Sequence, residues 1–105
     1  MPETVHDRWS HAIYLTEERW EHILEFHEEM TDFRDELFTT LIRGKRGQDA
    51  LDPSVYLYYH PFDHLPGGNT HVIVVVKFTT RVEGNRTRPN HFVLTAYLKT
   101  LFSQR

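Results

Sequence analysis

The sequence predicts a single domain of the α+β class, with two N-terminal helices packed on a small antiparallel sheet. Two observations lead to this prediction. Apolar residues recur at helical spacing between residues 16 and 43. Runs rich in β-branched and aromatic residues then follow from residue 54, separated by Gly, Asn and Pro. A chain of 105 residues can bury one core without disulfide or metal staples, so we expect residues 1–105 to form one domain.

The composition favours a protein that works inside the cell. There is no Cys, which excludes a disulfide framework and a thiolate metal site. The opening residues lack the apolar run of a secretion signal. The longest apolar stretch, Val72 to Val76, is far shorter than the roughly 20 residues that span a bilayer. We therefore expect a cytoplasmic location and no membrane partner.

The charges are segregated along an acidic chain. Twelve Lys and Arg face fifteen Asp and Glu, for a net charge of −3, so the whole chain has no electrostatic advantage in meeting a polyanion. Acidic residues dominate Glu17 to Glu36. Basic residues dominate the C-terminal quarter, at Arg81, Arg86, Arg88, Lys99 and Arg105. A local basic surface is compatible with this pattern.

Two helices are expected after a brief strand at His11–Leu15. Thr16 is the expected N-cap of the first helix, which should end near Phe26 or Glu28. Either Thr31 or Asp32 is the expected cap of the second, and Gly44 should end it. The apolar positions of the first helix are Trp20, Ile23, Leu24 and His27, and those of the second are Phe33, Leu37, Leu41 and Ile42.

Three strands are expected in the second half of the chain. Gly44–Pro53 has no periodicity and is predicted to be a loop. Strands at Ser54–His60 and His71–Val82 should pair antiparallel through a loop of about ten residues. Gly84 and Asn85 mark a reversal before a last strand at His91–Leu98.

Strand alternation assigns a core face and an open face. The expected core positions are Val72, Val74, Val76, Phe78, Phe92, Leu94, Ala96 and Leu98. The open face should carry His91, Val93, Thr95 and Tyr97, with Lys77 beside Thr95 or Tyr97. These polar residues are either ordinary half-exposed strand residues or a cradle for a phosphate and its transition-state charge. Likewise, Arg81, Arg86 and Arg88 are either a solvated hairpin tip or a clamp for backbone phosphates.

The eight histidines do not predict a metal site. His22 and His27 are five residues apart, which is not the i, i+4 spacing of a helical metal pair. His27 is either a buried histidine with one backbone partner or a general acid or base. His60, His64 and His71 surround a loop rich in Pro and Gly, for which a flexible, exposed loop is the favoured reading and a metal site the alternative. We expect neither a metal nor a cofactor.

Several segments, taken in order, resemble a known family. They are Arg19–Ile23 (RWEHI) with His27-Glu28, Val74–Lys77 (VVVK) and Phe92–Leu98 (FVLTAYL). Their order and spacing, from about Thr16 to Leu101, resemble the phage-associated nuclease-like branch of the barnase, EndoU, colicin and RelE superfamily. The resemblance implies a RelE/barnase-type domain in which the N-terminal helices pack on a curved antiparallel sheet of about four strands.

The resemblance also implies a function: a metal-independent endoribonuclease, often the toxin of a toxin–antitoxin or phage-related system. RNA and an antitoxin protein would be its partners. The catalytic residues it points to are His22, His27, Lys77, Thr95 and Tyr97, and the expected RNA-binding residues are Arg81, Arg86, Arg88 and His91. In this assignment the histidine and Tyr97 transfer protons, Lys77 stabilises charge and Thr95 positions the phosphate.

A non-catalytic protein-binding domain that uses the open sheet face is the alternative function. Tyr56, Tyr58 and His60 alternate on one side of their strand, and aromatic residues on a solvent face favour binding. A histidine, a lysine and a hydroxyl converging on one phosphate-sized site would favour the enzyme instead.

Overall fold

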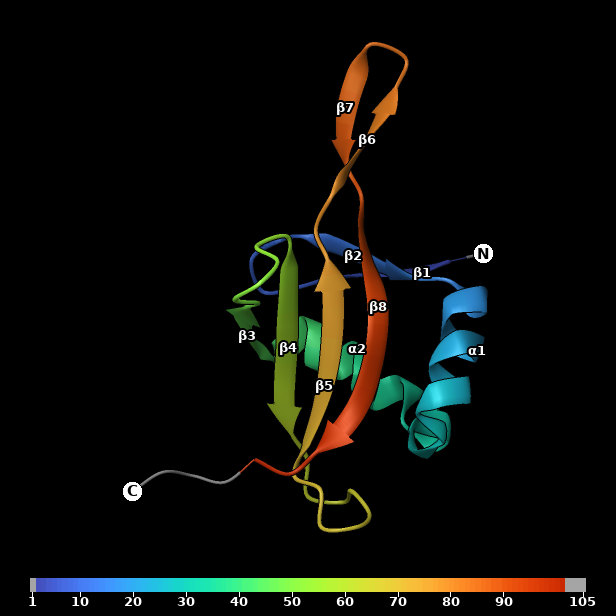
Figure 1. The fold of residues 1–105 in the computed structure, drawn as a ribbon, viewed down its shortest axis with the longest axis vertical. Helices are drawn as coiled ribbons and strands as arrows, with labels where there is room; N and C mark the ends of the chain where they lie inside the picture. Colours follow the sequence, from blue (N-terminus) through green and yellow to red (C-terminus); the bar gives the residue numbers. More distant parts are fainter. Residues whose placement is uncertain (1, 102–105) are drawn as a thin grey trace.

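The computed structural model describes residues 2–101, which form two α-helices, one 3₁₀ helix and eight strands. In chain order the elements are β1 (Glu3–His6), β2 (Ala12–Leu15), α1 (Glu17–Phe26), η1 (Glu28–Asp32), α2 (Arg34–Arg43), β3 (Lys45–Gln48), β4 (Val55–Pro61), β5 (His71–Lys77), β6 (Thr80–Glu83), β7 (Arg86–Pro89) and β8 (His91–Lys99). The α+β class is confirmed (Figure 1).

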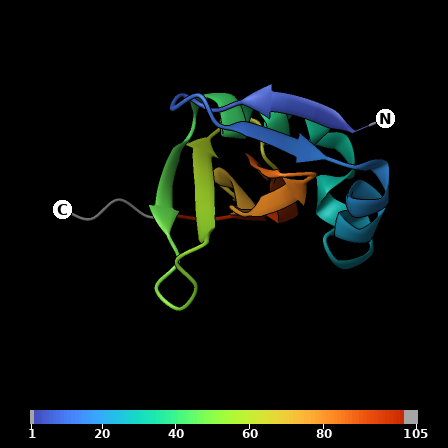
Figure 2. The ribbon, with the colours of Figure 1, turned by 90° about the horizontal axis from the view of Figure 1, so that it is seen from above.

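The sheet is larger than expected and is mixed. Its six strands have the order β1-β2-β8-β5-β4-β3, and every pair is antiparallel except β2 and β8. Seen from above, β1 and β2 at one edge run across the direction of β3 and β4 at the other, so the sheet is curved (Figure 2). The prediction of about four antiparallel strands with two helices N-terminal to them was therefore incomplete, because β1 and β2 precede α1.

The two strands of the main sheet that the sequence analysis missed are the edge strands β1 and β3. β1 has the sequence ETVH and β3 has KRGQ, and neither alternates apolar with polar residues. Their backbones pair with β2 and β4, but most of their side chains are exposed. Short, charged edge strands protect a sheet from pairing with other chains, and they carry no hydrophobic signal. The expected loop Gly44–Pro53 thus contains β3.

The first helix begins as predicted and the second does not. The Thr16 hydroxyl accepts a hydrogen bond from the backbone N–H of Arg19 at 3.0 Å, and α1 ends at Phe26. Thr31 and Asp32 lie inside η1 instead of capping α2. The cap position of α2 is Phe33, which makes no side-chain capping hydrogen bond.

The core lies between α2 and the inner face of the sheet. Leu37, Phe38 and Leu41 of α2 are buried against it, whereas Ile42 is 43% exposed and was wrongly placed in the apolar stripe. The apolar stripe of α2 includes Phe38 instead of Ile42, because residues 37, 38 and 41 share the face that meets β4 and β5. The buried hydrophobic positions of the sheet are Ile13, Leu15, Tyr58, Val72, Ile73, Val74, Val76, Val93, Ala96 and Leu98.

A β-bulge in β8 changes which of its residues face the core. Val75 pairs with Thr95 but Val76 pairs with Val93, which leaves Leu94 without a partner. An extra residue in one strand reverses the alternation beyond it. Val93, at 1% exposure, is therefore in the core, while Leu94 and Phe92 are only partly buried. The predicted faces were therefore wrong for the residues up to the bulge, with Phe92 and Leu94 expected in the core and His91 and Val93 on the open face. Beyond the bulge they were correct, with Ala96 and Leu98 in the core.

A separate hairpin projects from the end of the sheet. The strand expected at His71–Val82 ends at Lys77, and β6 then pairs with β7 away from the main sheet (Figure 1). Gly84 has φ +62° at the turn, a backbone conformation that glycine adopts without a steric cost. The reversal predicted at Gly84-Asn85 is confirmed.

A buried carboxylate holds the β1–β2 connection against β4. Asp7 Oδ1 accepts hydrogen bonds from the backbone N–H groups of Trp9 and His11, at 2.9 and 2.8 Å. Asp7 Oδ2 accepts from the Tyr58 hydroxyl at 2.5 Å and faces Arg46 Nη1 at 3.7 Å. Burial raises the pKa of Asp7, but the hydrogen bonds from Tyr58, His11 and Trp9 outweigh it and leave the pKa below its usual value. The carboxylate is therefore charged at neutral pH.

Replacing Tyr58 with Phe should destabilise the protein although it removes a single oxygen atom. The change leaves one oxygen of a buried, charged carboxylate without its hydroxyl donor. Asp7 Oδ2 keeps its contact with His11 Nδ1 at 3.1 Å, so the expected cost is that of one hydrogen bond to a charged group, about 1.5–3 kcal/mol. Urea denaturation should show this loss in the free energy of unfolding. An unfolding free energy equal to that of the parent would show that the hydrogen bonds of Asp7 do not stabilise the β1–β2 connection.

The bulge predicts that the smaller of two neighbouring truncations is the more costly one. Val93→Ala should lower the free energy of unfolding by about 2 kcal/mol, from lost apolar burial and a cavity. Leu94→Ala removes more atoms from a partly exposed site and should cost less. Thermal and urea melts of the two variants provide the comparison. A larger loss for Leu94→Ala would contradict the register described here.

Candidate functional site

The outer face of the sheet, opposite α2, carries three of the residues singled out by the sequence, Lys77, Thr95 and Tyr97. Cross-strand pairs place Lys45, Tyr59, Ile73 and Tyr97 in one continuous row across β3, β4, β5 and β8. Ile73 is only 5% exposed although it faces outward, because large side chains stand on both sides of it. This row is the floor of the candidate site.

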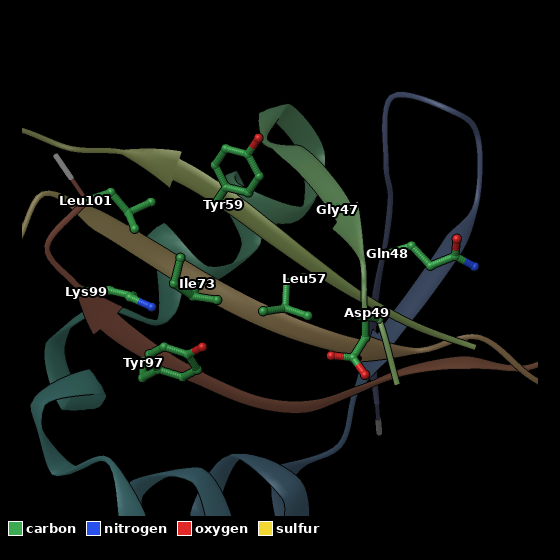
Figure 3. A pocket seen from close by; sticks show the side chains of 10 residues that line it. Gly47, Gln48, Asp49, Leu57, Tyr59, Ile73, Tyr97, Lys99 and Leu101 are labelled. Carbon is green, nitrogen blue, oxygen red and sulfur yellow. The ribbon is translucent and has the colours of Figure 1, made fainter. Parts of the chain in front are cut away.

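An open pocket of about 310 Å³ lies on this floor (Figure 3). Leu57, Ile73 and the rings of Tyr59 and Tyr97 line it, with Lys99 beside Tyr97 at one end. Asp49 and Gln48 lie at the opposite end of the pocket. The pocket thus joins an apolar surface that accepts a flat ring to a lysine that attracts an anion.

His27 meets Tyr97 at the end of this row. The centres of the two rings are 5.5 Å apart, and Nδ1 of His27 is 3.6 Å from a carboxylate oxygen of Glu29. His27 follows the last residue of α1, and Glu29 lies in η1. This separation is longer than a hydrogen bond, so Glu29 acts on a protonated His27 through its charge, and Nε2 is the ring nitrogen that does not face Glu29. The contact between His27 and Tyr97 was not foreseen from the sequence.

Lys77 is on the same face but far from this contact. It pairs with Phe92, and it lies four residues along β5 from Ile73, the partner of Tyr97. That separation is roughly 13 Å at about 3.3 Å per residue. Of the two neighbours expected for Lys77, Tyr97 is therefore remote. Thr95 is the nearer one, because it is opposite Val75, two residues from Lys77 along β5.

A carboxylate also holds the Lys77 ammonium. Its Nζ donates to Asp52 Oδ2 at 3.1 Å. Hydrogen bonds from the hydroxyl and the amide of Ser54, and then from Lys77, lower the pKa of Asp52 to about 2. Asp52 is therefore ionised, and the Lys77 charge has a partner within the protein.

His22 does not join His27. It lies on the exposed side of α1, where its ring centre is 5.0 Å from that of Phe26. Together with Glu18 and Arg19 it lines a shallow hollow. Of the two histidines that the resemblance pointed to, His27 is the one that contacts a residue of the last strand.

His91 lies on the inner side of the sheet, not on the open face. Its ring centre is 4.3 Å from that of Phe78 and 5.8 Å from that of His11. Its Nδ1 is buried and has no hydrogen-bond partner among the described residues. The bulge at Leu94 causes this reversal, so the prediction that His91 shares a face with Thr95 and Tyr97 was wrong.

The hairpin arginines are exposed and partly neutralised. Both carboxylate oxygens of Glu83 are engaged at 2.8 Å, one by Arg81 and the other by Arg88. Arg86 begins β7 next to the Gly84 turn. This arm projects beyond the end of the sheet at which β5 ends and β8 begins (Figure 1).

The loop histidines are not gathered around one point. His64 contacts Glu36 at 2.7 Å, and Nδ1 of His60 contacts the carbonyl of Pro61 at 2.8 Å. Among residues 2–101, no group of three or more His, Asp or Glu side chains is arranged to hold a metal ion.

The residues that sequence reasoning missed are Lys99 and Glu29. The expected last strand stopped at Leu98, but β8 continues to Lys99, which shares the face of Thr95 and Tyr97 by the same alternation. A strand boundary one residue later would have revealed Lys99. Glu29 has no comparable sequence signal, because its contact with His27 depends on the turn between α1 and η1.

Comparison with models of known protein families, with curated proteins and with solved structures found no match. Within the described part of the chain, the helices are all too short or too polar to cross a membrane.

The position of His91 predicts a loss of stability on acidification. Burial lowers the pKa of His91 from its ordinary value of 6.5, and His11 lowers it further. Below about pH 6.5 the unfolded chain therefore binds a proton more readily than the folded one, and the free energy of unfolding falls. His91→Phe keeps a ring against Phe78 and removes the titrating group, so its unfolding free energy should fall less between about pH 7.5 and about pH 5 in urea melts.

Part of the pH dependence should remain in that variant. Burial, and then the charge of His60, lower the pKa of His71 in the same direction. If acidification lowers the free energy of unfolding equally in the parent and in His91→Phe, His91 has the same pKa in the folded and the unfolded chain, and the prediction is wrong.

Proposed function

We propose that this protein is a metal-independent endoribonuclease whose catalytic site is the outer sheet face at His27 and Tyr97. The observation that carries the proposal is the contact between an imidazole and a phenol, with Glu29 at one imidazole nitrogen and Lys99 two residues along the strand. A histidine, a hydroxyl and a cation are the groups that RNA cleavage requires when no metal takes part.

The reaction follows from the roles of these groups. The free nitrogen of His27 takes the proton of the ribose 2′-hydroxyl, and the 2′-oxygen attacks phosphorus. The bond to the 5′-oxygen breaks, and the phenol of Tyr97 gives its proton to that leaving oxygen. Lys99 stabilises the negative charge that develops on the phosphorane, and the Thr95 hydroxyl positions the phosphate. The products are a 2′,3′-cyclic phosphate and a 5′-hydroxyl, so atoms and protons balance.

The family resemblance extends the proposal to the setting of the enzyme. It supports a cytoplasmic toxin of a toxin–antitoxin or phage-related system, with an antitoxin protein as partner. The resemblance segment Phe92–Leu98 includes Thr95 and Tyr97, and the segment His27-Glu28 supplies the histidine. Lys77, the lysine of the resemblance, is replaced in this proposal by Lys99, because Lys99 lines the same pocket as Tyr97.

One observation favours a second function, a protein-binding domain. The floor of the pocket is formed by Leu57, Ile73 and two tyrosine rings, a surface suited to an apolar side chain of a partner. This function needs the tyrosine rings but not the proton-transferring atoms of His27 and Tyr97. Conservative substitutions therefore separate the two.

His27→Ala and Tyr97→Phe should each reduce RNA cleavage by the purified protein by about 10²–10⁴-fold, the usual contribution of a positioned acid or base. Both should melt like the parent, because neither side chain is fully buried. Cleavage by the parent should persist in EDTA. A fluorogenic RNA assay with circular dichroism melts measures all three. Unchanged cleavage in both variants would contradict the nuclease and favour the protein-binding function.

The two lysines of the outer face form a matched pair for the same assay. Lys99→Ala should lower the cleavage rate by about a hundredfold, the typical effect of one group that stabilises transition-state charge. Lys77→Ala should lower it less, because Asp52 already holds that ammonium and the lysine is remote from Tyr97. A larger loss of cleavage rate in Lys77→Ala than in Lys99→Ala would support the catalytic role of Lys77 that the resemblance implies.

A further inference from the structure

A second pocket, rich in positive charge, lies at the β3 edge of the sheet. Arg8, Arg43 and Lys45 line it together with His60 and His71, and its volume is about 320 Å³. These residues come from the β1–β2 connection, the end of α2, β3, β4 and β5. No Asp or Glu lines the pocket. Five cationic or protonatable groups from five parts of the chain thus meet at one place.

The three permanent charges of this pocket are uncompensated. Within residues 2–101, none of Arg8, Arg43 and Lys45 forms an ion pair with a carboxylate. Several cations elsewhere do have such partners: Arg34 has Glu3 and Glu17, Lys77 has Asp52, and Arg81 and Arg88 share Glu83. Among the described residues Arg19, Arg86 and Lys99 also lack one, but they stand on three different elements, α1, β7 and β8, and do not gather in one pocket. In a chain with net charge −3, unpaired cations gathered in one pocket indicate a site for an anion.

Arg8 is held in place for such a ligand. One of its terminal nitrogens donates to the carbonyl oxygen of Arg43 at 2.5 Å, and its guanidinium lies 5.7 Å from the ring centre of Trp9. A guanidinium has five N–H donors in a rigid plane, so most of them stay available. Fixed donors beside the exposed Lys45 suit the oxygens of a phosphate.

The cationic pocket continues the row of the candidate active site. The row Lys45–Tyr59–Ile73–Tyr97 joins the two, and the ring of Tyr59 lines both pockets. Three strand spacings separate Lys45 from Tyr97, which is roughly 14 Å. A few nucleotides of single-stranded RNA span that distance. Their bases can stack on exposed aromatic rings, whereas paired bases in a duplex cannot.

We propose that the pocket of Arg8, Arg43 and Lys45 binds a backbone phosphate of single-stranded RNA, a few nucleotides from the bond that is cut. The RNA crosses the strands of the sheet along the row, with Tyr59 stacking a base between the two phosphates. The inference rests on the proposed function for the identity of the substrate. The chemistry of the pocket itself requires only a phosphate group.

The test measures binding separately from cleavage. The probe is a fluorescent single-stranded RNA with 2′-O-methyl groups, which cannot be cut because its nucleophile is blocked. The double variant Arg43→Ala/Lys45→Ala should bind it at least about tenfold more weakly. It should also lower the slope of log affinity against log salt by about 1.4, at about 0.7 per lost contact. Arg43→Lys/Lys45→Arg retains both charges and should bind nearly as the parent does.

The matched control is the double variant Arg81→Ala/Arg88→Ala, which removes two arginines from the projecting hairpin. It should weaken binding less than the pocket variant, because Glu83 already pairs with both arginines. A larger loss in the hairpin variant would place the main RNA contact on that arm and overturn the inference. Circular dichroism melts confirm that each variant is folded.

The remaining outcomes separate this inference from the proposed function. If the parent cleaves RNA and the pocket variant binds the blocked RNA as the parent does, the inference fails and the nuclease stands. If the pocket variant loses binding while the parent never cleaves, RNA binding stands and the nuclease fails. In a separate titration with inorganic phosphate, the NMR signals of the His60 and His71 imidazoles report binding in the pocket. A response to phosphate with no effect of the pocket variant on RNA binding would assign the pocket to a free phosphate and overturn the inference.

Discussion

The burial of one charged carboxylate, that of Asp7, constrains the rest of this fold. A charge removed from water is tolerated only where donors surround it, and the donors here come both from the adjoining turn and from a distant strand. Two are backbone amides of the β1–β2 connection, and one is the hydroxyl of Tyr58, 51 residues away. The guanidinium of Arg46 stacks on the rings of Trp9 and Tyr56, 4.3 and 4.4 Å from their centres, and brings β3 to the same point. The N-terminal hairpin is thereby tied to the opposite edge of the sheet, which bends the sheet around α2.

This closure gives the two faces of the sheet different roles. On the inner face, Asp7, Arg46 and Tyr58 contact one another through their polar groups, and these contacts stabilise the fold. On the outer face, His27 and Tyr97 are half-exposed and make few polar contacts within the chain. Groups that must exchange protons with a substrate need that freedom, whereas groups that hold a buried charge do not. The proposed chemistry is therefore confined to the face that α2 does not cover.

The placement of charge resolves an apparent conflict in the composition. A net charge of −3 argues against a polyanionic partner when the chain is treated as a whole. In three dimensions, carboxylates pair with many of the cations, at Arg34, Lys77, Arg81 and Arg88, and a separate group remains unpaired at the β3 edge. What a phosphate meets is the local field of that pocket, because more distant exposed charges are screened by salt.

The sequence by itself determined the class of the fold, the Thr16 cap, the antiparallel pairing of β4 with β5 and the hairpin at Gly84, because each depends on neighbours along the chain. Through the family resemblance it also pointed to Tyr97 and to His22 or His27 as proton-transfer groups of one site, without deciding between the two histidines. The tertiary structure alone decided that His27 and Tyr97 meet, that the Leu94 bulge sends His91 to the inner face, and that Asp52 holds Lys77. It also decided that β1 and β3 are strands, since polar edge strands are specified by the partner they pair with and not by their own periodicity. Local patterns fix local geometry, but the meeting of residues distant in sequence follows from closing the sheet around one core and one buried charge.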